Sequence, residues 1–127
     1  NTSSGKYSYN ASSDHFYMLI VPKGVDMTQL KLAFLNYNKS FHGSDGLRVT
    51  TSLLGDQSQI LIVNNFKSLE AVKAYLKEIT GDKKFMEEIK SVNIDDHFAI
   101  SKENFSILIN DKILNDYKVF YKSFYRN

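Results

Sequence analysis

Residues 14–21 read Asp-His-Phe-Tyr-Met-Leu-Ile-Val, and residues 96–101 read Asp-His-Phe-Ala-Ile-Ser, so the same three residues open two apolar stretches. Residues 16–21 form an uninterrupted apolar run of strand length, which is typical of a central strand covered on both faces. Pro22 and Gly24 then end the run. We expect the two stretches to be the first and last strands of one small sheet.

The rest of the chain alternates between helix and strand patterns. Asp26, Ser68 and Ser101 each precede apolar residues at helical spacing and are expected to be N-caps. The expected elements, in chain order, are strand 16–21, a helix ending near 42–43, a hairpin of strands 47–54 and 59–63, a helix that breaks at 81–82 with a short extension to 89, strand 96–101, helical turns to 109, and a final helix over 113–124. The order β-α-β-β-α-β with a C-terminal helical tail predicts an α+β fold, a ferredoxin-like sandwich with extra C-terminal helices.

The first fourteen residues differ in composition from the rest. They are rich in Ser, Asn and Gly, and Tyr7 and Tyr9 are their only large side chains. Such a stretch buries too little apolar area to offset the entropy lost on ordering it. We therefore expect residues 1–14 to be a flexible arm or linker, with docking of its tyrosines onto the domain or pairing with a sheet edge as alternatives. Residues 15–127 are expected to form a single domain.

Both faces of the expected sheet are apolar. Side-chain alternation puts one set of residues on the first face, namely Phe16, Met18, Ile20, Ile60 and Ile62, and a second set on the other, namely His15, Tyr17, Leu19, Val21, Leu61 and Val63. Two helices cover only one face, so the second face needs another cover. We expect the aromatic C-terminal helix there, rather than the N-terminal arm or another chain. The candidate binding residues, on a face that could stay open, are His15, Tyr17, Leu61, Val63 and His97.

The composition excludes several classes of function. The 16 Lys and Arg against 14 Asp and Glu give a net charge of +2 without strong clusters, which is too small a surplus for a nucleic-acid footprint. Strand 59–63 also lacks the stacking aromatics with which RNA-recognition modules of this topology bind bases. The chain has no cysteine, so disulfides and thiol chemistry are excluded. No apolar run reaches the length of a membrane span.

No set of residues matches a catalytic or metal site. We expect the third strand to separate His15 from His97, and two imidazoles without a third ligand make a poor zinc site. The alternative is that the first and last strands lie together, so that the two histidines meet and Asp14 and Asp96 complete the site. The adjacent acids at 87–88 and 95–96 diverge on a helix or a strand and are better explained as surface charge. The chain lacks the Gly-x-Ser-x-Gly elbow of a nucleophilic serine, and the glycine-bearing loop 43–46 lies between a helix and a strand, the wrong order for a phosphate loop. We expect no enzyme activity, no metal and no cofactor.

Several short aromatic motifs resemble one known family. The motifs are Tyr7-x-Tyr9-Asn10, His15-Phe16, Phe98-Ala99-Ile100-Ser101 followed by Asn104-Phe105, and Tyr117-x-x-Phe120-Tyr121-x-x-Phe124-Tyr125. Together they are similar to the C-terminal domain of Bacteroidetes tetratricopeptide-repeat lipoproteins associated with gliding motility and type IX secretion. The resemblance spans most of the chain. The helical repeats and the lipid-attachment cysteine of that family would lie upstream of residue 1.

The resemblance implies a domain that faces the periplasm and is attached to the outer membrane through its parent protein. It implies a protein partner, no catalytic residues, and membrane contact only through an upstream anchor. We expect a non-catalytic protein–protein interaction domain, a monomer or weak dimer, that binds no nucleic acid and uses an open sheet face or an edge strand. The alternative is a small-molecule-binding regulatory domain of ferredoxin-like fold that dimerises through its sheet.

Overall fold

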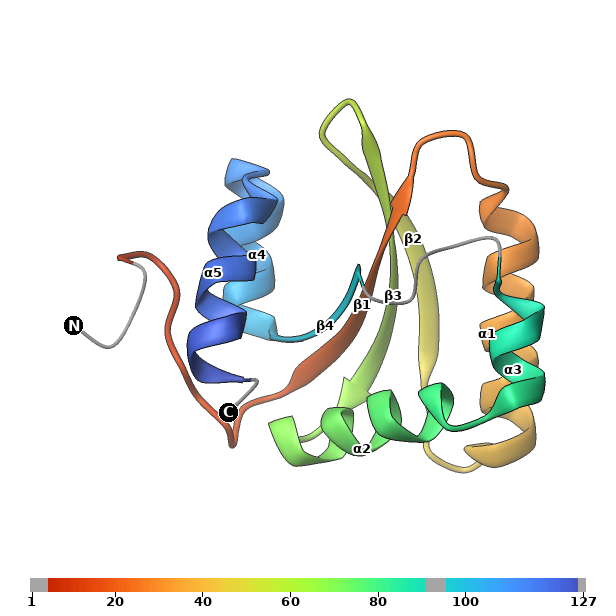
Figure 1. Cartoon of the computed structure of the whole chain (residues 1–127). Helices are drawn as coiled ribbons and strands as arrows, with labels where there is room; N and C mark the ends of the chain where they lie inside the picture. The colour runs from red at the N-terminus through yellow and green to blue at the C-terminus, as the bar shows by residue number, and fades with distance from the viewer. Residues whose placement is uncertain (1–4, 91–95, 126–127) are drawn as a thin grey trace.

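The computed structural model describes residues 5–90 and 96–125, and it has a four-stranded antiparallel sheet between two layers of helices (Figure 1). The elements, in chain order, are β1 (His15–Pro22), α1 (Met27–Phe41), β2 (Arg48–Leu54), β3 (Ser58–Phe66), α2 (Leu69–Thr80), α3 (Lys83–Glu88), β4 (His97–Ser101), α4 (Lys102–Asp111) and α5 (Leu114–Phe124). The predicted α+β class is confirmed, and each predicted element is present within a few residues of its expected bounds.

The sheet has the strand order β2-β3-β1-β4, and every neighbouring pair is antiparallel. Tyr17 lies opposite Val63 on β3 and opposite Ala99 on β4, so β1 and β3 are the central strands. The β1–β3 register shifts near Asn65, whose positive φ of 88° marks a local bulge. β2 and β4 are therefore the two edges of the sheet.

The three predicted N-caps are confirmed. The cap bonds run from Thr28 N–H to Asp26 (2.9 Å), from Ala71 N–H to Ser68 (3.2 Å) and from Asn104 N–H to Ser101 (3.1 Å). Each cap satisfies an N–H group that the first turn of a helix leaves unpaired. Ser101 is also the last residue of β4, so the chain passes from the sheet into α4 without a loop.

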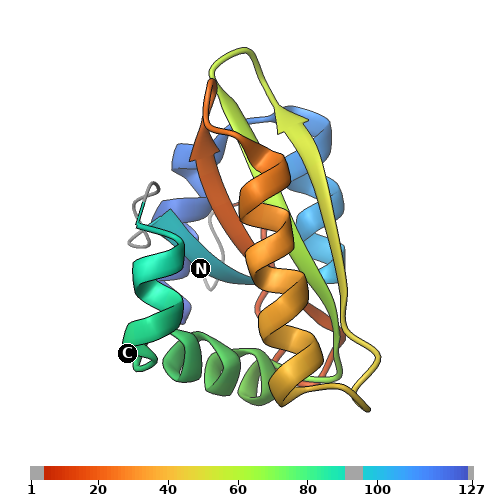
Figure 2. The same cartoon turned by 90° about the vertical axis from the view of Figure 1, so that its right-hand side faces the viewer.

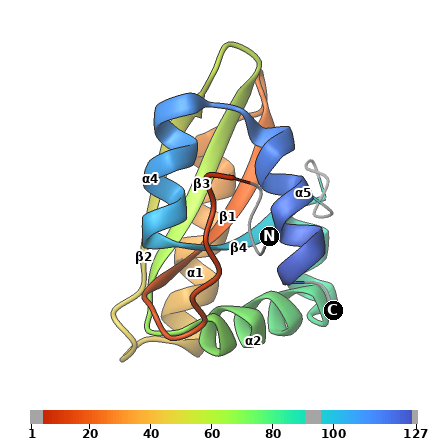
Figure 3. The same cartoon turned by 90° about the vertical axis from the view of Figure 1, so that its left-hand side faces the viewer.

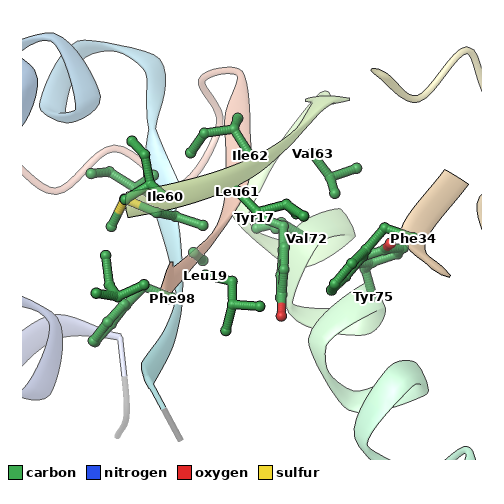
Figure 4. Packing of buried hydrophobic residues seen from close by; sticks show 14 of the residues in the cluster. Tyr17, Leu19, Phe34, Ile60, Leu61, Ile62, Val63, Val72, Tyr75 and Phe98 are labelled. Carbon is green, nitrogen blue, oxygen red and sulfur yellow. The ribbon is translucent and has the colours of Figure 1, made fainter. Parts of the chain in front are cut away.

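Helices α1, α2 and α3 cover the sheet face that carries Tyr17 (Figure 2). The Tyr17 ring lies 5.5 Å from Phe34 on α1 and 5.4 Å from Tyr75 on α2. Leu61 and Val63 share this face and are fully buried, and Figure 4 shows them between the strands and the helices. Burying an apolar side chain of this size contributes about 1.5–3 kcal/mol, so this helix layer cannot leave the sheet without a large loss of stability.

Helices α4 and α5 lie on the opposite face (Figures 1 and 3). The Phe98 ring of β4 is 5.0 Å from Tyr121 on α5, and the Tyr117 hydroxyl donates to the Ala99 carbonyl at 2.6 Å. The prediction that the aromatic C-terminal helix covers the second face is therefore confirmed. Both faces of the two central strands are packed against helices, whereas β2, at one edge of the sheet, has five of its seven residues exposed.

Candidate functional site

The five candidate binding residues lie on the face that α1, α2 and α3 cover, or at its margin. They are His15, Tyr17, Leu61, Val63 and His97; the first four are 0% exposed, and His97 is partly exposed. The prediction of an open face at these residues is wrong. Alternation shows which side chains share a face, but both faces are apolar, so the pattern does not show which one the helix layer covers.

His15 and His97 each have a structural partner. The His15 Nδ1 donates to the Ser13 carbonyl at 2.8 Å, so its Nε2 accepts from the Tyr125 hydroxyl at 2.9 Å. Burial lowers the pKa of His15, in keeping with a neutral ring. His97 Nδ1 lies 3.2 Å from the Tyr17 hydroxyl. The prediction that the third strand separates the two histidines is also wrong, because β4 pairs with β1; they are instead kept apart by four residues in the β1–β4 register, about 13 Å of strand.

A cluster that the sequence does not reveal joins the end of α1 to α2. The His42 Nδ1 lies 2.8 Å from Asp45 Oδ2, and its Nε2 lies 2.9 Å from Glu78 Oε2. The Tyr37 hydroxyl also donates to Glu78. Burial alone lowers the pKa of His42, but the hydrogen bonds to the two carboxylates outweigh that effect, and the pKa is raised above its ordinary value. We call these four residues the His42 cluster.

The His42 cluster is suited to holding α1 and α2 together rather than to catalysis. Carboxylates occupy both ring nitrogens, so the ring has no free position for a substrate. Within residues 5–90 and 96–125, no group of three His, Cys, Asp or Glu side chains is arranged to hold a metal ion. Of the acids considered from the sequence, Glu87 pairs with Lys90 at 2.6 Å, and residue 95 lies outside the described residues. Sequence patterns could not reveal the cluster, since 36 residues separate His42 from Glu78.

β2 is an edge strand whose outer side has no pairing partner among the described residues. Its seven residues pair with β3 in a regular register, and five of the seven are exposed. Proteins usually blunt such an edge with charges, proline or bulges, because its free N–H and C=O groups can pair with another chain. β2 has no proline and one charge, Arg48, at its first position. The β4 edge differs, because it has five residues and four of them are buried.

The flank of α1 beside β2 is both apolar and basic. Leu32 and Leu35, one turn apart, are 49% and 41% exposed. They line a hollow of about 410 Å³ that extends to Leu47, the residue before β2. Lys39 lines the same hollow, and Lys31 lies one turn before Leu35. We call the outer edge of β2, together with Leu32, Leu35, Lys31 and Lys39, the β2–α1 surface.

The N-terminal arm is docked over the described part of its length. Tyr7 is 0% exposed, and its ring lies 5.1 Å from Tyr117 on α5. The Lys6 ammonium lies 2.5 Å from Asp111 and 2.6 Å from Asp116. One expected alternative for residues 1–14 was that a tyrosine docks onto the domain, and Tyr7 does so in the structure. Residues 1–4 of the expected arm lie outside the described residues.

Comparison with family models, curated proteins and solved structures gives no match. No helix in the part of the chain that the structure describes is long and apolar enough to cross a membrane. Among the described residues, the β2–α1 surface combines an unpaired strand edge with exposed apolar side chains.

Proposed function

We propose that the chain is a non-catalytic protein-interaction domain that binds an extended segment of its partner by strand addition at β2. The observation that carries this proposal is the regular seven-residue edge of β2, with five exposed residues. In strand addition the partner's backbone continues the hydrogen-bond ladder and gives affinity, while its alternate side chains enter neighbouring pockets. The hollow beside α1 offers such a pocket.

The proposal assigns binding to an edge of the sheet rather than to a face. A partner that reached Tyr17 or Leu61 would first have to displace α1 or α2, at a cost of about 1.5–3 kcal/mol for each apolar side chain uncovered. The same burial weighs against the alternative, a regulatory domain that holds a small molecule between two sheet faces. An edge-to-edge dimer through β2 would leave both helix layers in place.

We also infer that the domain belongs to the ferredoxin-like class. In support, β1 and β2 run parallel with β3 between them, and β3 and β4 run parallel with β1 between them. A helix joins the strands of each such pair, which is the arrangement of a split β-α-β unit. Backbone proton contacts measured by NMR test this inference: β1 should contact both β3 and β4, and a direct contact between β1 and β2 would contradict it.

We further propose that the domain faces the periplasm and is attached to the outer membrane through its parent protein. The support for this proposal is the resemblance of the aromatic motifs to those of periplasm-facing lipoprotein domains, which implies a place at the end of a longer outer-membrane protein. Cell fractionation with an epitope tag on the full-length gene product tests this. A tag in the outer-membrane fraction, cleaved by protease only after that membrane is opened, is the expected result. A cytoplasmic tag would contradict it.

Proline variants of β2 test the strand-addition proposal. Successive residues of an antiparallel edge strand direct their backbone groups alternately to the neighbouring strand and to solvent. One of the variants Thr51→Pro and Ser52→Pro therefore removes a bond to β3, and the other removes only an outward donor. The variant that removes only the outward N–H should keep the wild-type thermal midpoint within about 2 °C. Peptide display should enrich peptides on the wild-type domain and about tenfold fewer on this variant.

Two results would overturn the proposal. Equal enrichment on both proteins would mean that the peptides bind away from β2, and no enrichment on the wild type would remove strand addition altogether. If both prolines unfold the domain, slower hydrogen exchange of the β2 amides on addition of an enriched peptide supplies the same evidence. A light-scattering mass with a thermal-shift screen addresses the alternative, which would be favoured by a dimer that one amino acid or nucleotide stabilises.

A further inference from the structure

We infer that the β2–α1 surface recognises an acidic extended segment: a partner strand with apolar side chains at alternate positions and Asp or Glu beside them. This inference rests on strand addition at β2 and adds the chemistry of the segment that binds there. Three observations carry it, namely the sign of the charges on the surface, the side chains that an added strand would meet, and the poor fit of other occupants.

The two elements that form the surface carry charges of one sign. α1 and β2 together contain Lys31, Lys39 and Arg48, and neither element contains Asp or Glu. Within residues 5–90 and 96–125, no ion pair joins any of the three to a carboxylate. Asp45 and Glu78, near the end of α1, are engaged with His42. Arg48 lies opposite Asn64 in the register, so its side chain is on the other side of the sheet from α1. An acidic partner would therefore compensate Lys31 and Lys39 on the α1 side, and each exposed pair would strengthen binding roughly 1.4- to 5-fold.

The side chains beside β2 set the pattern of the partner. Thr51 lies opposite Leu61 in the register, so Thr51 and Leu53 face the same side as α1, and Leu53 is 70% exposed. The side chains of an added strand on this side would meet Leu53 and the exposed Leu32 and Leu35, and we expect them to be apolar. On the other side an added strand would lie beside exposed Thr50 and Ser52, where polar residues are tolerated.

Other occupants fit this surface less well. Pairing of β2 with its own copy about a two-fold axis would set α1 beside α1 and bring Lys31 and Lys39 toward the same lysines of the copy. Like charges that meet across an interface oppose association. Nucleic acid would leave the free hydrogen-bond ladder of β2 unused, and three cations fall short of the roughly six to ten phosphate contacts of a stable complex.

A matched pair of peptides tests the inference on the whole chain. Both peptides have five central residues that alternate valine and threonine; one has two glutamates at each end, and the other has two lysines there. Fluorescence anisotropy should show that the acidic peptide binds about tenfold more tightly than the basic one, with a difference that shrinks as salt is added. The double variant Lys31→Glu/Lys39→Glu should reverse the preference. The control Lys73→Glu/Lys77→Glu makes the same charge change on exposed positions of α2 and should keep it.

The outcomes separate this inference from the function on which it rests. Equal binding of the two peptides, with slower hydrogen exchange in β2, would overturn the acidic preference and leave strand addition standing. Binding of neither peptide, with no change at β2, would remove both. A loss of preference in the α2 control as large as in the α1 variant would mean that net charge, and not the β2–α1 surface, selects the peptide. A concentrated sample that forms a dimer through β2 would also overturn the inference, in favour of a second copy.

Discussion

At the scale of single residues, two tyrosine hydroxyls in one aromatic cluster differ in their hydrogen bonding. The buried Tyr7 hydroxyl has no partner among the described residues, whereas the Tyr117 hydroxyl donates to the Ala99 carbonyl. An unpaired buried polar group costs about 1–3 kcal/mol. Tyr7→Phe should therefore raise the free energy of unfolding by about 1 kcal/mol, and Tyr117→Phe should lower it by about the same amount. Urea unfolding measures both, and a loss of stability in Tyr7→Phe would contradict the absence of a partner for that hydroxyl.

His42 makes stability depend on pH in one direction. Its pKa is raised in the folded protein, so the folded state holds the proton more tightly than the unfolded chain, in which histidine titrates near about 6.5. The stabilisation is complete below about pH 6.5 and is lost as the pH rises through the folded value. Thermal midpoints between about pH 5.5 and 8.5 should fall on the alkaline side in the wild type, and His42→Gln should lose this slope.

His15 does not affect the comparison of the wild type with His42→Gln. The lowered pKa of His15 has the opposite sign: the unfolded chain takes up its proton first, so the His15 contribution removes stability as the pH falls below about 6.5. His15 is present in both proteins, and the difference between the two curves isolates His42. Parallel curves would mean that the His42 cluster does not hold α1 and α2 together.

At the scale of elements, α5 serves as the cover of the second sheet face. Phe120 is 1% exposed, and its ring lies 5.7 Å from both Tyr7 and Tyr117. Phe120→Ala should therefore lower the free energy of unfolding by about 3–5 kcal/mol. Val119→Ala on the same helix, at a side chain that is 54% exposed, should change it by less than about 0.5 kcal/mol. A loss below about 1 kcal/mol at Phe120 would mean that α5 can leave the sheet and is free to bind another molecule.

The same elements show how far sequence patterns reach. A cap such as Ser68 and the apolar spacing that follows it depend on neighbouring residues, so the helices, strands and their order could be predicted. The faces of Tyr17 and Met18 are equally apolar, and only long-range packing decides which helices cover each one. The prediction that the Tyr17 face stays open was wrong for this reason. The contact between His42 and Glu78 leaves no local pattern, and the accessibility of β2 follows from the order of strands that lie far apart in the chain.

At the scale of the whole molecule, the N-terminal arm connects the two helix layers. The Ala11 carbonyl accepts from the Leu69 amide at the start of α2, at 2.9 Å. The Asp14 carbonyl accepts from the Lys102 amide at the start of α4, also at 2.9 Å. The arm is therefore bonded to both helix layers, and these layers cover the two central strands. The proposed role of β2 thus depends on the arm being part of the domain.

Removing residues 1–9 tests that dependence. The deletion takes the buried Tyr7 away from α5 and leaves the bonds of residues 10–14, and it should lower the free energy of unfolding by about 3–5 kcal/mol. The Lys6 ion pairs are partly exposed and should contribute less than about 1 kcal/mol of this. Tyr7→Ala in the full chain should reproduce most of the loss in urea unfolding followed by circular dichroism. A change within about 0.5 kcal/mol would mean that the arm acts as a linker, and that the surface of α4 and α5 under it is available to another chain.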